Sequence, residues 1–279
     1  MGPVISAIML VLIIIFLICA CIFVYMTTPG KFRWFDLPAV YCHRGYYDNE
    51  QIPENSLAAF RRSAENNLAV ELDVRPTKDG EVVVFHDETL QRVCGDSRNV
   101  RDLTLKELKE IPLLNTEERI PTFSEALSAC GGVPIYCEVK TDSTDIDEAF
   151  LKKVYDLIAG YEGQIVVVSF NPFVLRWFKE NHPELIRGFL SCNFSEMKGK
   201  PHIIMYKCLA NLMSNCIAKP DFISYRFTDK SLGLSMCRFY GVRLVAWTVH
   251  SMDDVEHAAN LGYSTFVGEH FDMTEVLAQ

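Results

Sequence analysis

The sequence predicts a (β/α)8 barrel preceded by one membrane-spanning helix, and three observations lead to this prediction. An uncharged apolar run opens the chain from Val4 to Met26. After residue 38, short apolar runs alternate with amphipathic stretches, a pattern typical of parallel strands connected by helices. Eight such runs fall within residues 39–279, a length close to the roughly 250 residues of a (β/α)8 barrel.

An open, doubly wound sheet is the alternative arrangement of the same units. Its dinucleotide-binding form carries a GxGxxG motif after the first strand, and no such motif follows residues 39–42. The composition excludes other classes of protein. A hydrophobic share of 49% is too high for a disordered chain, and a net charge of −9 argues against nucleic acid as a partner.

The N-terminal run is long enough to cross a bilayer, because about 20 apolar residues span a hydrocarbon core of ~30 Å. It lacks the preceding positive charge and the small-residue cleavage site of a signal peptide, which is the alternative interpretation. Residues 1–26 are therefore predicted to be a single-pass anchor in the lipid bilayer. The side of the membrane stays open. Lys31 and Arg33 favour a cytosolic barrel, whereas the glycosylation sequon Asn193-Phe194-Ser195 would act only on the luminal side.

The remaining elements follow in order, with residues 27–38 read as a linker and residues 39–279 as the barrel domain. Strands are expected where short apolar runs lie between turn residues, at 39–42, 69–74, 134–139, 165–169, 186–190, 221–224, 243–248 and 265–267. Helices are expected at the amphipathic stretches 56–67, 123–129, 145–159, 172–181, 229–240 and 253–260. The stretch from Cys192 to Lys219 is the least regular part of the chain.

One apolar run, Val82–His86, breaks the alternation. It follows the second strand after only the seven residues from Arg75 to Glu81, whereas a parallel crossover needs a dozen or more. Asp79-Gly80 is instead a strong turn signal. We therefore expect a small β-hairpin after strand 2, outside the count of eight.

Polar residues gather at the predicted strand ends, which form the active-site face of a barrel. They are His43, Arg44, Glu71, Asp73, His86, Glu138 and Lys140. Side chains alternate faces along a strand, so Glu71 and Asp73 point the same way. Two carboxylates on one inward face repel each other unless a cation offsets their charge.

This set of residue types predicts a site for a phosphate ester. Three carboxylates from neighbouring strands, Glu71, Asp73 and Glu138, offer an all-oxygen site that suits Mg²⁺ or Ca²⁺. Two fixed cations, Arg44 and Lys140, can bind phosphate oxygens. Two histidines, His43 and His86, can act as acid and base near neutral pH.

The stretch from His43 to Arg92 resembles the signature of the glycerophosphodiester phosphodiesterase family. It contains HRG, a Pro-Glu-Asn-Ser segment before an Ala-Phe helix, ExDV, TxDG, and HD followed by Leu-x-Arg. Further similarities are Ile120–Glu125, Glu138–Lys140 and Ala246–Val249, so the resemblance covers residues 39 to 250.

The resemblance implies a (β/α)8 barrel that binds Mg²⁺ or Ca²⁺, and it implies a role for each matching residue. The catalytic positions are His43 and His86, the phosphate-binding positions are Arg44 and Lys140, and the metal ligands are Glu71, Asp73 and Glu138. Trp247 matches an aromatic residue of the substrate pocket, with a barrel-core tryptophan as the alternative. Glu54 and Asn55 match a segment that holds the first loop, although Asn55 could equally cap the following helix.

Three places depart from the family pattern. Ser56 stands where the family usually has Thr, which is a conservative change, and His250 stands where the family usually has Asn after Trp-Thr-Val. The segment Thr265–His270 replaces a Thr-Asp-x-Pro-like run, which puts the last loop of the barrel in doubt.

The function expected from the resemblance is metal-dependent hydrolysis of glycerophosphodiesters to glycerol 3-phosphate and an alcohol such as choline, ethanolamine or inositol. The histidine roles stay open, with His43 as acid and His86 as base preferred. The anchor suggests an alternative, a lysophospholipase D acting on lysophospholipids or N-acyl-glycerophosphoethanolamines. Residues 197–216 would then form an apolar lip, although an ordinary barrel helix and loop would have the same composition. Two more functions stay open: a phospholipase C or D of the same barrel type, and a non-catalytic, membrane-tethered phosphate-ester binding protein.

Overall fold

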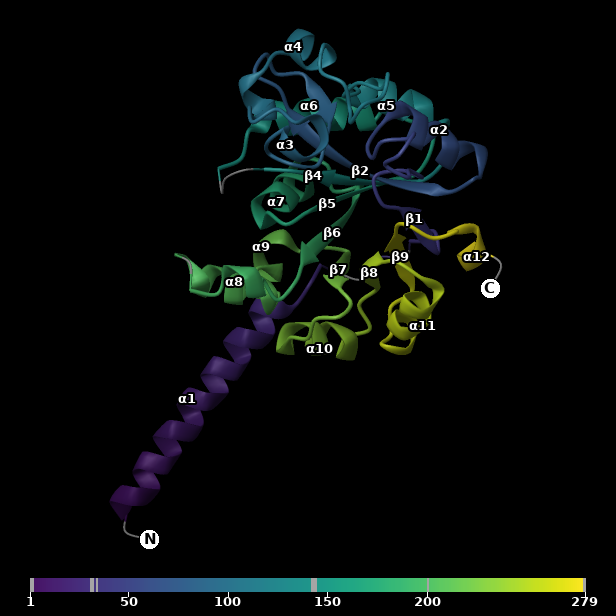
Figure 1. Ribbon diagram of the computed structural model, residues 1–279. Coiled ribbons are helices and arrows are strands. Elements are labelled where there is room, and N and C mark those ends of the chain that lie inside the picture. The colour runs from purple at the N-terminus through teal and green to yellow at the C-terminus, as the bar shows by residue number, and fades with distance from the viewer. Residues whose placement is uncertain (1–2, 31–32, 34, 142–144, 200, 278–279) are drawn as a thin grey trace.

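The computed structural model describes residues 3–30, 33, 35–141, 145–199 and 201–277 and shows a closed barrel of parallel strands (Figure 1). Lys31 and the two ends of the chain, 1–2 and 278–279, lie outside the described residues. The barrel closes where β1 pairs with both β2 and β9. Its strands are β1 (Val40–Cys42), β2 (Ala69–Pro76), β4 (Ile135–Val139), β5 (Ile165–Ser169), β6 (Ile186–Ser191), β7 (Phe222–Arg226), β8 (Leu244–Val249) and β9 (Thr265–Gly268). The predicted fold is therefore confirmed.

The predicted hairpin is also confirmed. Strand β3 (Val82–Val84) pairs antiparallel with the end of β2, and the turn between them contains Gly80 at φ 76°. The chain then forms α3 (Gln91–Cys94), a 3-10 turn (Val100–Asp102) and α4 (Leu105–Lys109) around a small apolar cluster of their own. These short elements were not predicted, because four or five residues are too few to show a helical period.

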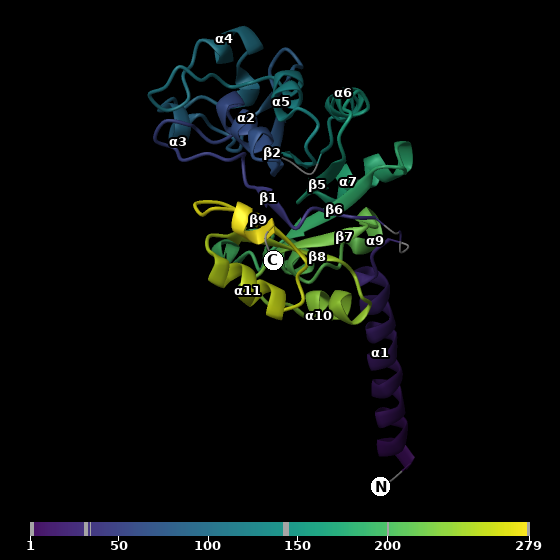
Figure 2. The ribbon, with the colours of Figure 1, turned by 90° about the vertical axis from the view of Figure 1, so that its right-hand side faces the viewer.

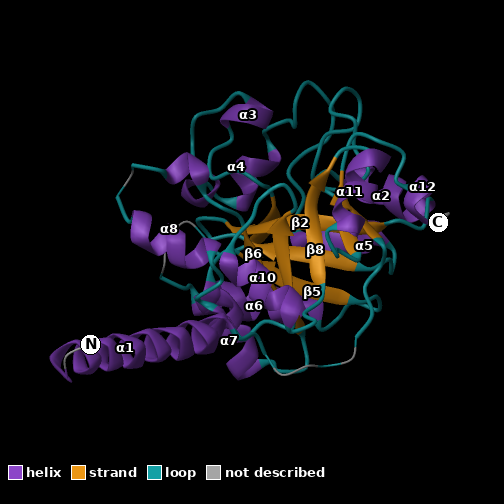
Figure 3. Cartoon of the chain, turned by 90° about the horizontal axis from the view of Figure 1, so that it is seen from below, coloured by secondary structure: helices purple, strands orange, loops and turns teal. Residues whose placement is uncertain are grey.

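The six predicted helices are present around the barrel (Figure 3). They are α2 (Leu57–Glu65), α5 (Phe123–Cys130), α6 (Glu148–Ile158), α7 (Pro172–Asn181), α10 (Leu232–Phe239) and α11 (Met252–Asn260). Three of them, α2, α6 and α10, begin later than predicted because a polar residue caps them. Ser56, Asp147 and Ser231 accept a hydrogen bond from a backbone N–H of the first turn. The irregular stretch forms a 3-10 turn (Ser195–Met197), α8 (Ile203–Ala210) and α9 (Asn215–Ala218), and α12 (Thr274–Leu277) follows β9.

The barrel interior is packed with side chains below the carboxyl ends of the strands. Tyr41, Tyr136 and Phe222 are buried there, with ring centroids 5.2 Å and 5.9 Å apart along the series. A Cβ at Gly188 of β6 would come within 2.3 Å of the Phe222 ring, so glycine leaves room for that ring. This packing fills the lower barrel and leaves polar side chains for the layer above.

Helix α1 (Pro3–Thr27) projects away from the barrel (Figures 1 and 2). An 18-residue window within Val4–Thr27 has a mean hydropathy of 3.5, and the helix is long enough to span a membrane, although a signal sequence meets the same criterion. The end of α1 and the segment after it contact the barrel. Asn215 donates a hydrogen bond of 2.7 Å to the carbonyl of Thr27, and the Arg33 guanidinium forms two bonds of 2.9 Å and 2.8 Å with Asp221. Both the end of α1 and the chain between α1 and β1 are thus attached to the barrel.

Candidate active site

The pairing of β2 with β4 brings three carboxylates together at the carboxyl end of the barrel. Asp73 is aligned with Glu138, and Glu71 points to the same inner face two residues earlier. One oxygen from each of Glu71, Asp73 and Glu138 lies within 4.8 Å of the others, and all three residues are buried. Strand register alone therefore builds a cluster of acidic oxygens at the top of the packed interior.

The charge of this acidic cluster is only partly balanced. Lys140 Nζ lies 3.1 Å from Asp73 Oδ1 and 2.7 Å from Glu138 Oε1, and Arg44 Nε lies 3.9 Å from Asp73 Oδ2. Burial raises the pKa of Asp73, but the charges of Lys140, His86 and Arg44 outweigh it and hold that pKa below its usual range. Three carboxylates against two cations leave one formal negative charge.

The pKa of Glu71 reflects this imbalance of charge. Burial raises its pKa well above the usual value, and the charges of Asp73 and Glu138 raise it further. A divalent cation would remove this repulsion, and ionised carboxylates are the donors that Mg²⁺ and Ca²⁺ prefer. The three residues thus fit a hard divalent metal in burial, donor type and charge.

The loop after β1 places Arg44 above the acidic cluster. Its backbone N–H donates to Glu71 Oε2 at 2.7 Å, and its Nη1 donates to Glu54 Oε1 at 2.6 Å. The next residue, Gly45, has φ 83°, and a Cβ there would lie 2.9 Å from the Cβ of Ala59. Only glycine fits this turn, which explains the residue after Arg44 in the His-Arg-Gly motif.

The segment after this loop holds it in place, as the sequence predicted. Glu54 accepts bonds of 2.7 Å from both Nη atoms of Arg92, in addition to the bond from Arg44. Asn55 donates to Asp73 Oδ2 at 2.9 Å and does not cap α2. The cap is Ser56, which accepts from the N–H of Ala59, so the alternative interpretation of Asn55 is wrong.

Both predicted histidines face a carboxylate through Nδ1. His43 Nδ1 bonds to Glu269 Oε2, and His86 Nδ1 lies 2.6 Å from Asp87 Oδ1. The carboxylate of Asp73 interacts electrostatically with both imidazoles. In both rings Nδ1 is therefore engaged by a carboxylate, and Nε2 is the second ring nitrogen with donor or acceptor capacity.

The pKa of His43 depends on Glu269. Burial lowers the pKa of His43, and the hydrogen bond and charge of Glu269 oppose this effect. Burial also raises the pKa of Glu269, but bonds from His43 and Tyr47 outweigh it and lower that pKa to about 2. Tyr47 Oη donates to the same oxygen at 2.6 Å. Glu269 is thus an ionised partner that holds the His43 ring.

Sequence reasoning missed Glu269, although a signal for it existed. The residue directly follows β9, and polar residues at strand ends are the ones that face a barrel's active site. The departure from the family pattern in this segment concealed it. The side chains of His250 and His270 also lie near Glu269, with ring nitrogens 3.5 Å and 3.6 Å from Oε1.

Trp247 lies near the end of β8, between the inner core and the mouth of the barrel. Its ring packs edge-on against Phe170 with centroids 5.6 Å apart, and it covers the inner apolar cluster while staying partly exposed. The Arg226 guanidinium lies 6.0 Å from the ring centroid. The position fits both a pocket residue and a cap of the core, so a contact with substrate stays a prediction.

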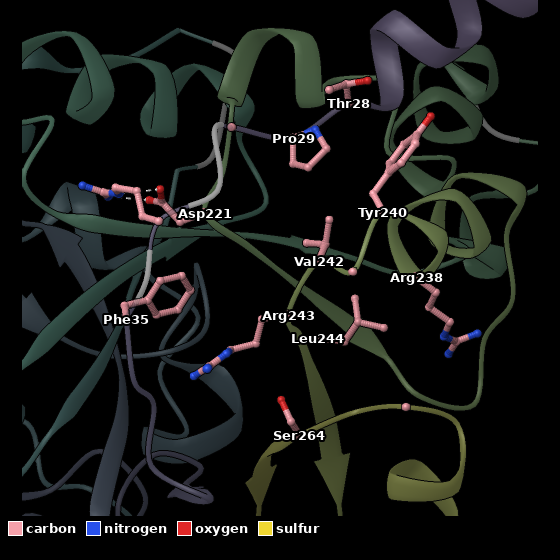
Figure 4. Close-up of a pocket in the computed structure, with 14 residues that line it drawn as sticks. Thr28, Pro29, Phe35, Asp221, Arg238, Tyr240, Val242, Arg243, Leu244 and Ser264 are labelled. Carbon is pink, nitrogen blue, oxygen red and sulfur yellow. Dashed lines mark hydrogen bonds and ion pairs between the residues drawn. The ribbon is translucent and has the colours of Figure 1, made fainter.

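A separate cavity of about 640 Å³ lies at the opposite end of the barrel (Figure 4). Asp221, Arg243 and Ser264, which precede or begin β7, β8 and β9, line it together with Phe35. In barrel enzymes the amino ends of the strands serve stability, whereas the carboxyl ends carry the chemistry. The acidic cluster, and not this cavity, is therefore the candidate catalytic site.

The comparisons with known proteins agree with this geometry. The model of the glycerophosphoryl diester phosphodiesterase family matches residues 43–273. A glycerophosphodiester phosphodiesterase of Caldanaerobacter subterraneus is 30% identical over 245 residues, which cover 80% of this chain and 90% of that protein. A human lysophospholipase D is 31% identical over 144 residues, covering 46% of this chain and 45% of that protein.

Solved structures show the same fold. A phosphodiesterase of Oleispira antarctica, in complex with the product sn-glycerol-3-phosphate, has a TM-score of 0.70 and 22% identity, covering 87% of this chain and 98% of that one. The matched region contains every residue of the acidic cluster and both histidines. The chain therefore belongs to the glycerophosphoryl diester phosphodiesterase family, a family of phosphoric diester hydrolases.

Proposed function

We propose that this chain hydrolyses glycerophosphodiesters to glycerol 3-phosphate and an alcohol with one divalent metal ion and two histidines. The observation that carries the proposal is the buried cluster of Glu71, Asp73 and Glu138, with Arg44 and Lys140 attached. Its one net negative charge becomes one net positive charge when a divalent cation binds. That charge is complementary to the single negative charge of a phosphodiester.

The three carboxylates would hold Mg²⁺ or Ca²⁺, which polarises a phosphoryl oxygen when bound. Arg44 and Lys140 would bind the other phosphoryl oxygens, since both cations lie at the rim of the same cluster. Their positive charge is worth most in the transition state, where the negative charge on the phosphoryl oxygens increases.

The two histidines would transfer protons on opposite sides of the phosphorus atom. One Nε2 accepts a proton from the nucleophile as its oxygen bonds to phosphorus. The nucleophile is water, which gives glycerol 3-phosphate directly, or a neighbouring substrate hydroxyl, which gives a cyclic phosphate that a water molecule then opens to glycerol 3-phosphate. The other Nε2 donates a proton to the alcohol oxygen as the second phosphorus–oxygen bond breaks. We assign His43 as the acid and His86 as the base. Glu269 and Asp87 orient the rings through Nδ1.

The test uses the full chain in detergent micelles with glycerophosphocholine as substrate. We expect release of choline and glycerol 3-phosphate, loss of activity in EDTA, and recovery with Mg²⁺ or Ca²⁺. Full activity in EDTA would refute the metal site. Binding of glycerophosphocholine without turnover, with metal present, would instead support the non-catalytic alternative.

The membrane anchor is part of the proposal. Thr27 at the end of α1 is buried against the barrel and bonded to Asn215, which supports retention of α1 in the mature protein. Carbonate extraction of expressing cells should leave the chain in the membrane fraction, and mass spectrometry should find the N-terminal peptide. A mature chain that starts near residue 27 would show that α1 is a signal sequence.

A further inference from the structure

A groove of about 790 Å³ connects the acidic cluster with the end of α1. Glu138 and Lys140 are among its lining residues, and so is Met26 near the end of α1. Helix α9 contacts α1 and lies beside its C-terminal end (Figures 1 and 2). The groove therefore runs from the proposed catalytic residues to the place where the chain enters the membrane.

The other residues that line the groove are mostly apolar. Phe170 and Phe173 come from the turn from β5 into α7. Further apolar residues come from α8 and from the residues around α9: Met205, Leu209, Met213 and Ile217. Methionine side chains adapt to flexible apolar ligands. The volume lies within the range of about 300–1,000 Å³ typical of small-molecule sites. A chain of methylenes is the ligand that fits such walls.

The surface around the groove fits a position at the bilayer. The end of α1 is bonded to the barrel through Thr27, and the segment after it is bonded through Arg33. Helix α10 packs against α1, and its Leu232 and Phe239 side chains are 62% and 83% exposed. Exposed aromatic and aliphatic residues beside a membrane span are typical of an interfacial surface. A lipid could thus enter the groove at Met26 without leaving the apolar phase.

We propose that the groove binds the single acyl chain of a lysophospholipid, with the phosphodiester at the acidic cluster. This inference rests on the proposed function and names a substrate class for it. Water adds across the bond between phosphorus and the head-group oxygen, so the products are an acyl-glycerol phosphate and the free head-group alcohol. The glycerol keeps its acyl chain, which stays in the groove while the alcohol leaves.

The experiment measures competition between two substrates in one reaction. The full chain in lipid nanodiscs, with Mg²⁺ and Ca²⁺, receives glycerophosphocholine and lauroyl-lysophosphatidylcholine together. Mass spectrometry quantifies glycerol 3-phosphate and lauroyl-glycerol phosphate separately, which gives the ratio of the two kcat/KM values. We expect the lipid product to dominate.

Two neighbouring residues of α8 supply the matched variants. Met205 lines the groove, whereas Ile204 is 76% exposed and is not among the groove residues. In Met205→Gln an amide replaces an apolar contact, and we expect the lipid preference to fall by about 10-fold, with glycerophosphocholine turnover unchanged. Ile204→Gln should keep the preference. A general effect on lipid access would lower the preference in both variants, so only the difference between them reports on the groove.

A chain-length series sharpens the result. In the wild type, kcat/KM should rise by up to about 4-fold for each added methylene that is buried, and this slope should be shallower in Met205→Gln. If glycerophosphocholine is hydrolysed but kcat/KM for lysophospholipids does not depend on chain length, the groove proposal is overturned and the proposed function stands. Equal lipid preferences in the two variants would have the same meaning. If neither glycerophosphocholine nor the lysophospholipid is hydrolysed, both the groove proposal and the proposed function are overturned.

Discussion

The two sides of the barrel are built for different tasks. Strands β1, β2 and β4, with the arm that contains β3, supply both histidines, the acidic cluster and its two cations, all between residues 43 and 140. Helices α9 and α10, on either side of β7, hold the end of α1. One half therefore carries the chemistry and the other carries the attachment, and the groove connects them. Substitutions in the first half should change turnover of every substrate, whereas those in the second should change lipid selection and stability.

The largest expected effect is in the catalytic half. His86→Ala removes one proton-transfer group and should lower kcat for glycerophosphocholine by about 10²–10⁴-fold, without a change in the thermal unfolding midpoint. His257→Ala is the control, because His257 is exposed on α11. Equal turnover by the wild type and His86→Ala would remove His86 from the mechanism.

The second effect concerns the pH dependence of the same half. Glu269 raises the pKa of His43 against the lowering effect of burial, so Glu269→Gln should lower that pKa further. If His43 is the acid, activity is lost as pH rises through its pKa, and this basic limb of the profile moves to lower pH. If His43 is the base, the acidic limb moves to lower pH instead. The profile of kcat/KM in the variant therefore assigns the roles, which the sequence left open.

A smaller change at the same place is the control for this profile. Tyr47→Phe removes the bond of 2.6 Å to Glu269 and a longer one of 3.5 Å to His270 Nε2, and it leaves the carboxylate facing His43. We expect kcat to fall on the order of 10-fold in Glu269→Gln and less in Tyr47→Phe. A profile of Glu269→Gln in which neither limb moves would show that the carboxylate does not act through His43.

The catalytic half was largely predictable from the sequence, for a physical reason. Short apolar runs mark buried parallel strands, and in a barrel the residues at their carboxyl ends must meet. Glu71, Asp73 and Glu138 come together through the register of two adjacent strands, which alternation alone indicates. Arg44 comes just after the end of the first strand, so the same rule places it at the rim of the cluster.

Glu269 and the groove were less predictable, because both depend on contacts between distant segments. Glu269 meets His43 across 226 residues, and only the closure of the barrel between β1 and β9 brings them together. The groove needs Met26, Glu138 and Met213 at one place, and these come from three separate parts of the chain. The irregular composition of residues 192–219 indicated an unusual segment, but its position against α1 is a property of packing.

The smallest effect tests the attachment half. Arg33 binds the buried carboxylate of Asp221 with two nitrogens and also donates to the carbonyl of Leu185 at 2.7 Å. Arg33→Ala leaves Asp221 with Arg187 as a cationic neighbour at 3.3 Å, so we expect a loss of about 1–2 kcal/mol in the free energy of unfolding.

Arg176→Ala is the matched control for this change. Its exposed pair with Glu180, one turn apart on α7, is worth about 0.3–0.5 kcal/mol. Thermal unfolding of the full chain in detergent compares the two variants, and glycerophosphocholine turnover below the transition should equal that of the wild type in both. A clear loss of that turnover in Arg33→Ala would show that the attachment half also shapes the catalytic site, and the division between the two halves would then fail.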